Sequence, residues 1–267
     1  MTKTLYVTDL DGTLLRKDQT LSPFTCETIN ALVEQGMLFS FATARSIVTG
    51  RKVTAGLVPQ VPQIVYNGCF IVRRSGERLW TRFFARRESA EILRALLEAG
   101  VVPIVYSVIG GEEKFSFDPA RANRATLEFN ESRRGDPRQN YVSAYEDLGE
   151  IFYFTCIDAP ERLGPLYERL RGKYHCVYGR DIYSGEQWLE VMACTKAEAA
   201  LRLKELFDCD RLVCFGDGKN DIPMFEIADE CYAVENADAQ LKAIATGVIG
   251  SNMEDGVARW LREHAEF

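Results

Sequence analysis

Close to one end of the sequence lies the segment Leu5-Tyr6-Val7-Thr8-Asp9-Leu10-Asp11-Gly12-Thr13. Its first four residues are apolar or β-branched, which is typical of a short buried β-strand. The predicted strand ends at Asp9, and the turn after it carries a second acid, Asp11. In an open sheet of parallel strands, ligands bind at the carboxyl ends of the strands. We therefore expect Asp9 and Asp11 to lie at a binding edge.

The residues after this segment alternate between helix and strand signals. Ser22-Pro23 begins a predicted helix that ends at Gly36, because Ser is a good N-cap and Pro is tolerated in the first turn. Apolar runs over residues 37–42 and 63–66 predict two further strands. The βαβ order predicts an α/β fold with a Rossmann-like parallel sheet.

Residues 70–83 predict a hairpin around Ser75-Gly76, and the alternation of strand and helix returns only near residue 187. The residues between the hairpin and residue 187 predict an α+β unit, although the polar stretch 119–150 gives no clear element. After it, Trp188 to Met192 predicts a strand, and Thr195-Lys196-Ala197-Glu198 has the pattern of a capping box that begins a helix. We predict a core formed by residues 1–82 and 187–267, with an inserted domain at 83–186.

Composition excludes several classes of protein. The chain has 267 residues, 46% of them hydrophobic, and a net charge of -7. The negative charge argues against nucleic acid as a partner, because duplex binding depends on Lys and Arg. No apolar stretch approaches a membrane span, and no secretory signal pattern is visible, so we expect a cytoplasmic protein. The eight Cys lack a Cys-x-x-Cys pair, which argues against a zinc site.

Polar side chains are predicted to converge at the carboxyl edge of the sheet. They are Asp9, Asp11, Thr43, Asn67, Asp217 and Asp221, with Lys196 at the start of a helix. Crowded carboxylates are stabilised by a hard cation, and Mg²⁺ is the natural choice where a phosphate shares the site. A Lys then supplies a point charge for a phosphate oxygen, and a carboxylate can attack phosphorus.

The ordered set of motifs resembles the haloacid dehalogenase (HAD) superfamily. Four segments match its motifs in order: Asp9-Leu10-Asp11-Gly12-Thr13, Thr43-Ala44-Arg45, Lys196, and Gly216-Asp217-Gly218-Lys219-Asn220-Asp221. Further segments are similar to the Cof-type subfamily: Asn67-Gly68, Trp188-Leu189-Glu190-Val191, Glu235-Asn236-Ala237, and Asp255-Gly256-Val257-Ala258. The position of the insert, after the second motif, resembles that of the type-two (C2B) cap, which carries substrate specificity.

The resemblance implies a role for each motif residue. Asp9 is expected to be the nucleophile and a magnesium ligand, and Asp11 the general acid and base, with its backbone carbonyl on the metal. The other implied metal ligands are Asp217 and Asp221. The implied phosphate or substrate contacts are Thr43, Ala44, Arg45, Asn67, Lys196 and Asn220. For Arg45, a substrate contact and a salt bridge inside the core stay equally open.

These observations predict a magnesium-dependent phosphomonoesterase that works through an aspartyl-phosphate. Sugar phosphates are the first expected substrates, followed by pyridoxal phosphate or flavin mononucleotide. A phosphomutase and a non-catalytic protein that binds a phosphorylated ligand are the alternatives. A calcium loop of the EF-hand type is excluded, because the twelfth position counted from Asp9 is Thr20 and that counted from Asp217 is Ala228, where Glu is required.

Overall fold

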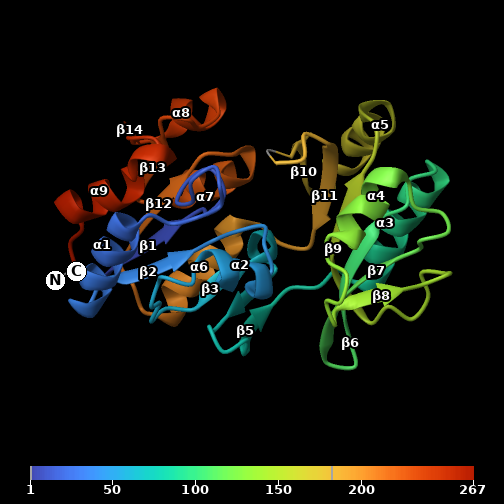
Figure 1. Cartoon of the computed structure of the whole chain (residues 1–267), viewed down its shortest axis with the longest axis horizontal. Helices are drawn as coiled ribbons and strands as arrows, with labels where there is room; N and C mark the ends of the chain where they lie inside the picture. The colour runs from blue at the N-terminus through green and yellow to red at the C-terminus, as the bar shows by residue number, and fades with distance from the viewer. Residues whose placement is uncertain (1, 182) are drawn as a thin grey trace. The chain divides into compact units, whose positions relative to one another are not determined.

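The computed structural model describes residues 2–181 and 183–267. The chain forms two compact units, which Figure 1 shows with their elements labelled. The first unit consists of Met1–Thr81 with Cys194–Phe267, and the second consists of Arg82–Ala193. The second unit is therefore an insertion in the sequence of the first.

A parallel sheet forms the centre of the first unit. Its strands lie in the order β14-β13-β12-β1-β2, and every neighbouring pair is parallel. Their bounds are Thr4–Thr8 for β1, Leu38–Phe41 for β2, Arg211–Gly216 for β12, Glu230–Val234 for β13 and Gly247–Ile249 for β14. All five residues of β1 are buried, as expected of a central strand covered on both faces. The predicted α/β fold with a parallel sheet is confirmed.

Helices flank this sheet. The helix α1 packs against α9, while α6 packs against α7 and α7 against α8. The helix bounds are Pro23–Glu34 for α1, Ile47–Val53 for α2, Lys196–Leu206 for α6, Ile222–Ile227 for α7, Ala239–Ile244 for α8 and Gly256–His264 for α9. Short 3₁₀ turns lie at Tyr66–Gly68, Lys219–Asp221 and Asn252–Glu254. The caps predicted at Ser22 and at Thr195 with Glu198 are both present.

The strand predicted over residues 63–66 does not extend the parallel sheet. As β3 (Gln63–Val65), it pairs antiparallel with β4 (Phe70–Val72), which pairs with β5 (Arg78–Thr81). One isolated bridge, from Ala42 to Ile64, connects it to the chain beyond β2. The turn after β3 has positive φ at Tyr66 (52°) and Asn67 (51°), which reverses the chain onto β4. The hairpin predicted over residues 70–83 is confirmed by the antiparallel pair of β4 and β5, but the sequence pattern did not predict that β3 joins it.

The inserted unit is built on a six-stranded sheet in the order β10-β11-β9-β6-β7-β8. Its pairs are antiparallel except for β7 with β8. The strands are β6 Ile104–Ile109, β7 Glu112–Phe117, β8 Gln139–Tyr141, β9 Glu150–Ile157, β10 His175–Arg180 and β11 Gln187–Met192. The helices are α3 Arg86–Glu98, α4 Arg124–Glu131 and α5 Pro160–Leu170. Apolar side chains of α3 and α5 share a buried cluster with this sheet, so the insert has its own core.

The boundaries of the insert differ from those predicted at 83 and 186. Strand β11 pairs with β9 and β10, and the second unit runs from Arg82 to Ala193. Assigning residues 187–193 to the core was therefore wrong. An apolar strand has the same local pattern in either unit, and only its pairing partners decide where it belongs.

Across the residues that the structure describes, no helix is both long enough and apolar enough to span a membrane.

Candidate active site

Asp9 lies at the point where the central strand β1 leaves the sheet. Its backbone N–H donates to the carbonyl of Phe215 on β12 (2.9 Å), and its side chain is buried. Along the chain, β1 is followed by β2, which lies on one side of β1 in the sheet. The later strands β12, β13 and β14 lie on the other side of β1, so the strand order reverses at this point. This reversal is where ligands bind in open α/β sheets.

Gly12 allows two acidic segments to approach each other closely. Its φ of +83° favours glycine, and a Cβ at this position would lie 2.1 Å from Oδ2 of Asp217. The neighbouring Thr13 donates its hydroxyl to Oδ1 of Asp217 (3.0 Å). The first and fourth motifs, about 200 residues apart in sequence, are thus in direct contact.

Lys196 joins two carboxylates at the start of α6. Its Nζ lies 2.5 Å from Oδ1 of Asp9 and 2.7 Å from Oδ1 of Asp221, and the side chain is 1% exposed. Burial lowers the pKa of this ammonium, but Asp221 and Asp9 raise the pKa by more, so the net shift is upward. Lys196 therefore stays charged inside the protein.

The fourth motif supplies two carboxylates with different surroundings. Asp221 is fully buried, and its Oδ2 accepts hydrogen bonds from the backbone N–H groups of Asp217 and Gly218, both at 3.0 Å. Asp217 is partly exposed, and burial together with the charge of Asp221 raises the pKa of its carboxyl to about 7. The pKa of Asp9 is also raised, mainly by burial. The site is therefore crowded with negative charge.

The donor set suits a hard divalent cation. Asp9, Asp217 and Asp221 each offer a carboxylate oxygen, and these oxygens lie within 4.8 Å of one another. Oxygen ligands on few carboxylates are the pattern of magnesium sites that also hold a phosphate. A cation here would relieve the repulsion that raises the pKa of Asp217.

The second motif contributes Thr43, Ala44 and Arg45. Thr43 is fully buried, and its Oγ1 accepts from the backbone N–H of Arg45 (3.1 Å). Arg45 donates two hydrogen bonds to the carboxylate of Asp11, from Nε at 2.7 Å and from Nη2 at 2.5 Å, and Nη2 also donates to Gln19 (2.8 Å). Both members of the pair are partly exposed, so this is a salt bridge within the site and not one inside the core.

Asn67 and Asn220 meet across the site. The Nδ2 of Asn220 lies 3.1 Å from Oδ1 of Asn67, whose backbone N–H donates to the carbonyl of Thr43 (2.9 Å). Gly68 lies against the chain before Lys196, because a Cβ there would be 2.0 Å from the carbonyl oxygen of Thr195. The two asparagines therefore link the second motif to the fourth, close to the start of α6.

A family model for haloacid dehalogenase-like hydrolases matches residues 6–261. The chain belongs to this family. The HAD-like chain is 28% identical to the 5-amino-6-(5-phospho-D-ribitylamino)uracil phosphatase YwtE of Bacillus subtilis, with 95% of each chain covered. It is 25% identical to a second enzyme of that name and organism, YitU, with 97% of each covered.

Solved structures share the fold of this HAD-like hydrolase. TM0651 from Thermotoga maritima matches with a TM-score of 0.78 and 23% identity, over 100% of this chain and 99% of that one. The HAD subclass IIB sugar phosphatase BT4131 matches with a TM-score of 0.76 and 20% identity, over 98% of both chains. At these identities the likeness establishes a common fold of both units.

The structure brings together the residues that the motifs predicted, and it adds contacts that they did not. The Arg45–Asp11 pair was not predicted, since sequence shows no distance between the two motifs. Asn236 and Asn252, near the end of the chain, contact backbone carbonyls of the first motif's turn. Asn236 lies in a segment that resembles the Cof-type subfamily, whereas Asn252 lies just before one, and nothing in the sequence pointed to these contacts.

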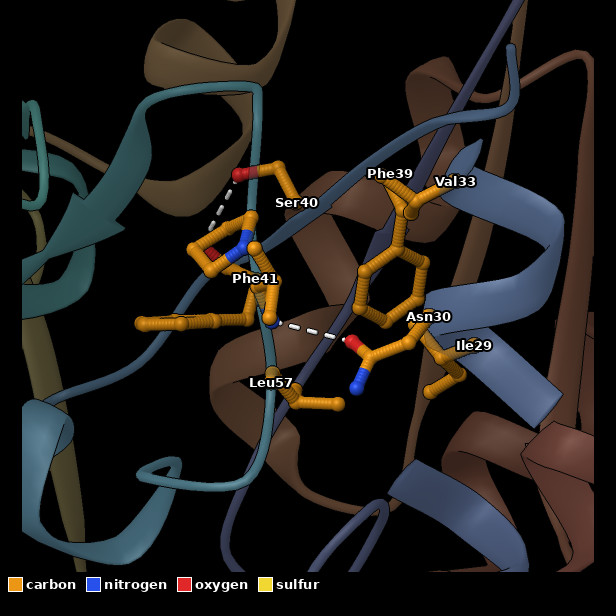
Figure 2. Close-up of a pocket in the computed structure, with 9 residues that line it drawn as sticks. Ile29, Asn30, Val33, Phe39, Ser40, Phe41 and Leu57 are labelled. Atoms are coloured by element: carbon orange, nitrogen blue, oxygen red, sulfur yellow. Dashed lines mark hydrogen bonds between the residues drawn. The ribbon is translucent and has the colours of Figure 1, made fainter. Parts of the chain in front are cut away.

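A separate pocket of the same unit is apolar. Figure 2 shows it between α1, β2 and the loop before β3, with Ile29, Phe39 and Leu57 among its lining residues. No charged side chain is among the residues that line it. It therefore offers nothing that would hold a phosphate, unlike the acidic site.

Proposed function

We propose that this phosphatase of the HAD-like hydrolase family hydrolyses small phosphomonoesters with Mg²⁺, through an aspartyl-phosphate on Asp9. One observation carries the proposal: the buried ammonium of Lys196 holds the carboxylates of Asp9 and Asp221 beside Asp217, at the reversal point of a parallel sheet. This arrangement concentrates positive and negative groups where a phosphoryl group needs both a nucleophile and charge stabilisation.

The proposed reaction has two steps. A carboxylate oxygen of Asp9 forms a bond to phosphorus while the ester P–O bond breaks, and Asp11 donates a proton to the leaving oxygen. A water molecule then attacks the phosphorus of the aspartyl-phosphate, Asp11 takes its proton, and inorganic phosphate leaves with Asp9 restored. Lys196 keeps its charge in both steps and binds a phosphoryl oxygen.

The salt bridge between Arg45 and Asp11 has a consequence for the first step. Both oxygens of Asp11 accept hydrogen bonds from Arg45. The pair must therefore separate before Asp11 can donate a proton to a leaving oxygen. We propose that the substrate's phosphate draws the guanidinium of Arg45 away, because guanidinium groups bind phosphate and carboxylate with the same two-pronged geometry.

For the metal, we assign Asp9, Asp217 and Asp221 as the side chains that hold Mg²⁺, with the backbone carbonyl of Asp11. Asp221 acts through water in this assignment, because its oxygens already accept from Lys196 and from two backbone N–H groups. When bound, the cation neutralises charge that develops on the phosphoryl oxygens. Thr43 and Asn220 are the proposed neutral donors to the phosphate.

The substrate proposed is a primary phosphate ester on a chain of hydroxyl-bearing carbons. The relatives YitU and YwtE are named for a phosphoribitylamino compound, and BT4131 is called a sugar phosphatase. Both kinds of compound carry phosphate on a polyhydroxylated carbon chain. Sugar phosphates and ribityl phosphates, flavin mononucleotide among the latter, therefore come before pyridoxal phosphate. We assign selection among them to the inserted unit, Arg82–Ala193.

The test is a panel of phosphorylated metabolites, with release of free phosphate measured in the presence of Mg²⁺. The proposal predicts that Asp9→Asn protein loses essentially all turnover, and that exhaustive chelation does the same to the wild type. Asp18→Asn is the matched control, because Asp18 lies in the same loop and, among the residues that the structure describes, its carboxylate bonds to Thr20 two residues away. Full activity of the Asp9→Asn protein would exclude the aspartyl-phosphate. Interconversion of sugar-phosphate isomers without phosphate release would instead identify a mutase.

A further inference from the structure

We propose that Asn236 and Asn252 are positioning residues for Asp11. The inference rests on the proposed function, in which Asp11 is the proton donor to the leaving group. Neither asparagine is among the groups of the site that would touch a phosphate or a cation. Both contact the turn that carries Asp11, at two carbonyls three residues apart.

The contacts form one continuous bracket around the turn. The Nδ2 of Asn236 donates to the carbonyl of Gly12 (2.7 Å), and its Oδ1 accepts from the backbone N–H of Asn252 (3.1 Å). The Nδ2 of Asn252 donates to the carbonyl of Leu15 (2.8 Å). Leu15 is itself joined to Asp11 by a β-bridge. The bracket therefore holds the backbone directly after Asp11 and also the residue paired with Asp11.

The chemistry of the bracket requires the amide side chain at position 236. A primary amide donates through nitrogen and accepts through oxygen at the same time, whereas a carboxylate only accepts. Asn236 uses both functions, one toward Gly12 and one toward Asn252. Asn252 is 4% exposed, so the bracket is anchored in the interior of the unit.

A salt bridge also connects the segment that carries Asn252 to the chain just after the turn. Asp255 accepts two hydrogen bonds from Nη2 of Arg16, both at 3.1 Å, directly after Leu15 in sequence. Gly256 leaves no space for a side chain, because a Cβ there would lie 1.8 Å from the carbonyl oxygen of Gly250. The salt bridge and the contact of Asn252 therefore attach this segment to the turn, while Gly250 and Gly256 pack the segment on itself.

This arrangement predicts a selective effect on catalysis. If the bracket sets the position of Asp11, its loss weakens protonation of the leaving oxygen and leaves the Asp9–Lys196 contact in place. An alkyl phosphate needs that protonation, because an alkoxide is a poor leaving group. A nitrophenyl phosphate needs it much less, since nitrophenolate leaves as a stabilised anion.

The experiment compares kcat/KM for an alkyl sugar phosphate and for p-nitrophenyl phosphate in Asn236→Ala protein with Mg²⁺. kcat/KM reports the steps up to formation of the aspartyl-phosphate. We expect kcat/KM to fall by about tenfold or more for the alkyl ester and by less than about threefold for the aryl ester. The reason is that proton transfer is sensitive to the position of the proton donor. Asn252→Asp, which is nearly isosteric but cannot donate to Leu15, should show the same selectivity.

Asn30→Ala is the matched control. Asn30 brackets another loop of the same unit in the same way, donating from Nδ2 to the carbonyl of Gly56 and accepting from the N–H of Val58, both at 2.9 Å. Figure 2 shows its amide beside Ile29, with the second hydrogen bond drawn. It bonds to no residue of the catalytic turn, so its loss should affect both esters equally. Comparing Asn30→Ala with Asn236→Ala therefore separates a positioning role from general destabilisation of the unit.

Each outcome decides one question. Equal losses for the two esters in the Asn236→Ala protein, or no loss for either, would overturn the positioning role while leaving the proposed function intact. A wild-type protein that hydrolyses neither ester would instead overturn the proposed function. Because Asn236 is exposed, its substitution should leave the protein folded, and the melting temperature measured beside the kinetics verifies this.

Discussion

Replacing Asp217 by Asn should stabilise the metal-free protein at alkaline pH, although it removes a proposed metal ligand. Burial and the charge of Asp221 raise the pKa of Asp217 from 3.8 to about 7. The folded state therefore binds this proton more tightly than the unfolded state does. The contribution of this proton to the free energy of unfolding is fully present below pH 3.8 and is lost as the pH rises through 7. Above that pH the ionised Asp217 opposes folding, and an amide does not.

The size of the effect follows from the shift. Each unit of pKa corresponds to about 1.4 kcal/mol, so a rise of about 3 units sets an upper limit of about 4 kcal/mol. Solvent reaches the partly exposed side chain and screens it, so we expect roughly half of that, about 2 kcal/mol, at pH 8. At pH 5 only about a third of the effect is present. For a chain of this size, 2 kcal/mol corresponds to a rise in melting temperature of about 4 °C or more.

The assay is thermal unfolding of wild-type and Asp217→Asn protein at pH 5 and pH 8, in excess chelator. Asp229→Asn is a control of opposite sign. Burial raises the pKa of Asp229, but hydrogen bonds from the N–H of Leu212 (2.7 Å) and from Lys204 (3.1 Å) outweigh it and lower the pKa. That variant should melt below the wild type at pH 8. A gain for Asp217→Asn that is equal at both pH values, or a loss at pH 8, would refute the reasoning. Added Mg²⁺ should reverse the order, because only the wild type keeps the full ligand set.

Two further substitutions probe the packing of the site. Lys196→Met should lower the free energy of unfolding by about 3–5 kcal/mol and abolish turnover, because it leaves Asp9 and Asp221 buried without their cation. Chemical denaturation at pH 8 measures the free energy of unfolding, and an unchanged denaturation midpoint would contradict this prediction. Gly68→Ala should lower the melting temperature and kcat together. The φ of Gly68 is +106°, which disfavours alanine, and the added Cβ would lie 2.0 Å from the carbonyl oxygen of Thr195. A variant with wild-type melting and activity would show that the contact is easily relaxed.

Local sequence patterns predicted the strands and helices of the first unit correctly where only one pairing or packing position was available to an element. The apolar run before Asp9 became the central strand, and the capping box at Thr195 starts α6 as predicted. The prediction failed where a strand had two possible partners. Residues 63–65 and 187–192 form the strands β3 and β11, but they pair in sheets other than the one expected. Pairing depends on residues distant in sequence, so local propensity does not determine it.

The inserted unit was less readable for a related reason. Residues 119–150 contain α4 and β8, although their polar composition predicted neither. The helix α4 is short, and its residues Ala125 and Phe129 pack against a small buried cluster that includes Phe115 and Phe117. Short elements are stabilised mainly by tertiary packing, which sequence periodicity does not report.

By itself the sequence determined which chemical groups the motifs contain, since their residue types and order supply several carboxylates and a lysine. It also predicted a turn directly after Asp9, whereas the close approach of Gly12 to Asp217 came from the structure. Only the tertiary structure decided how these groups are paired. It joined Lys196 to two carboxylates, Arg45 to Asp11, and Asn236 to the carbonyl of Gly12. The physical reason is that hydrogen bonds and charge interactions act over a few ångströms, whatever the separation of their partners along the chain.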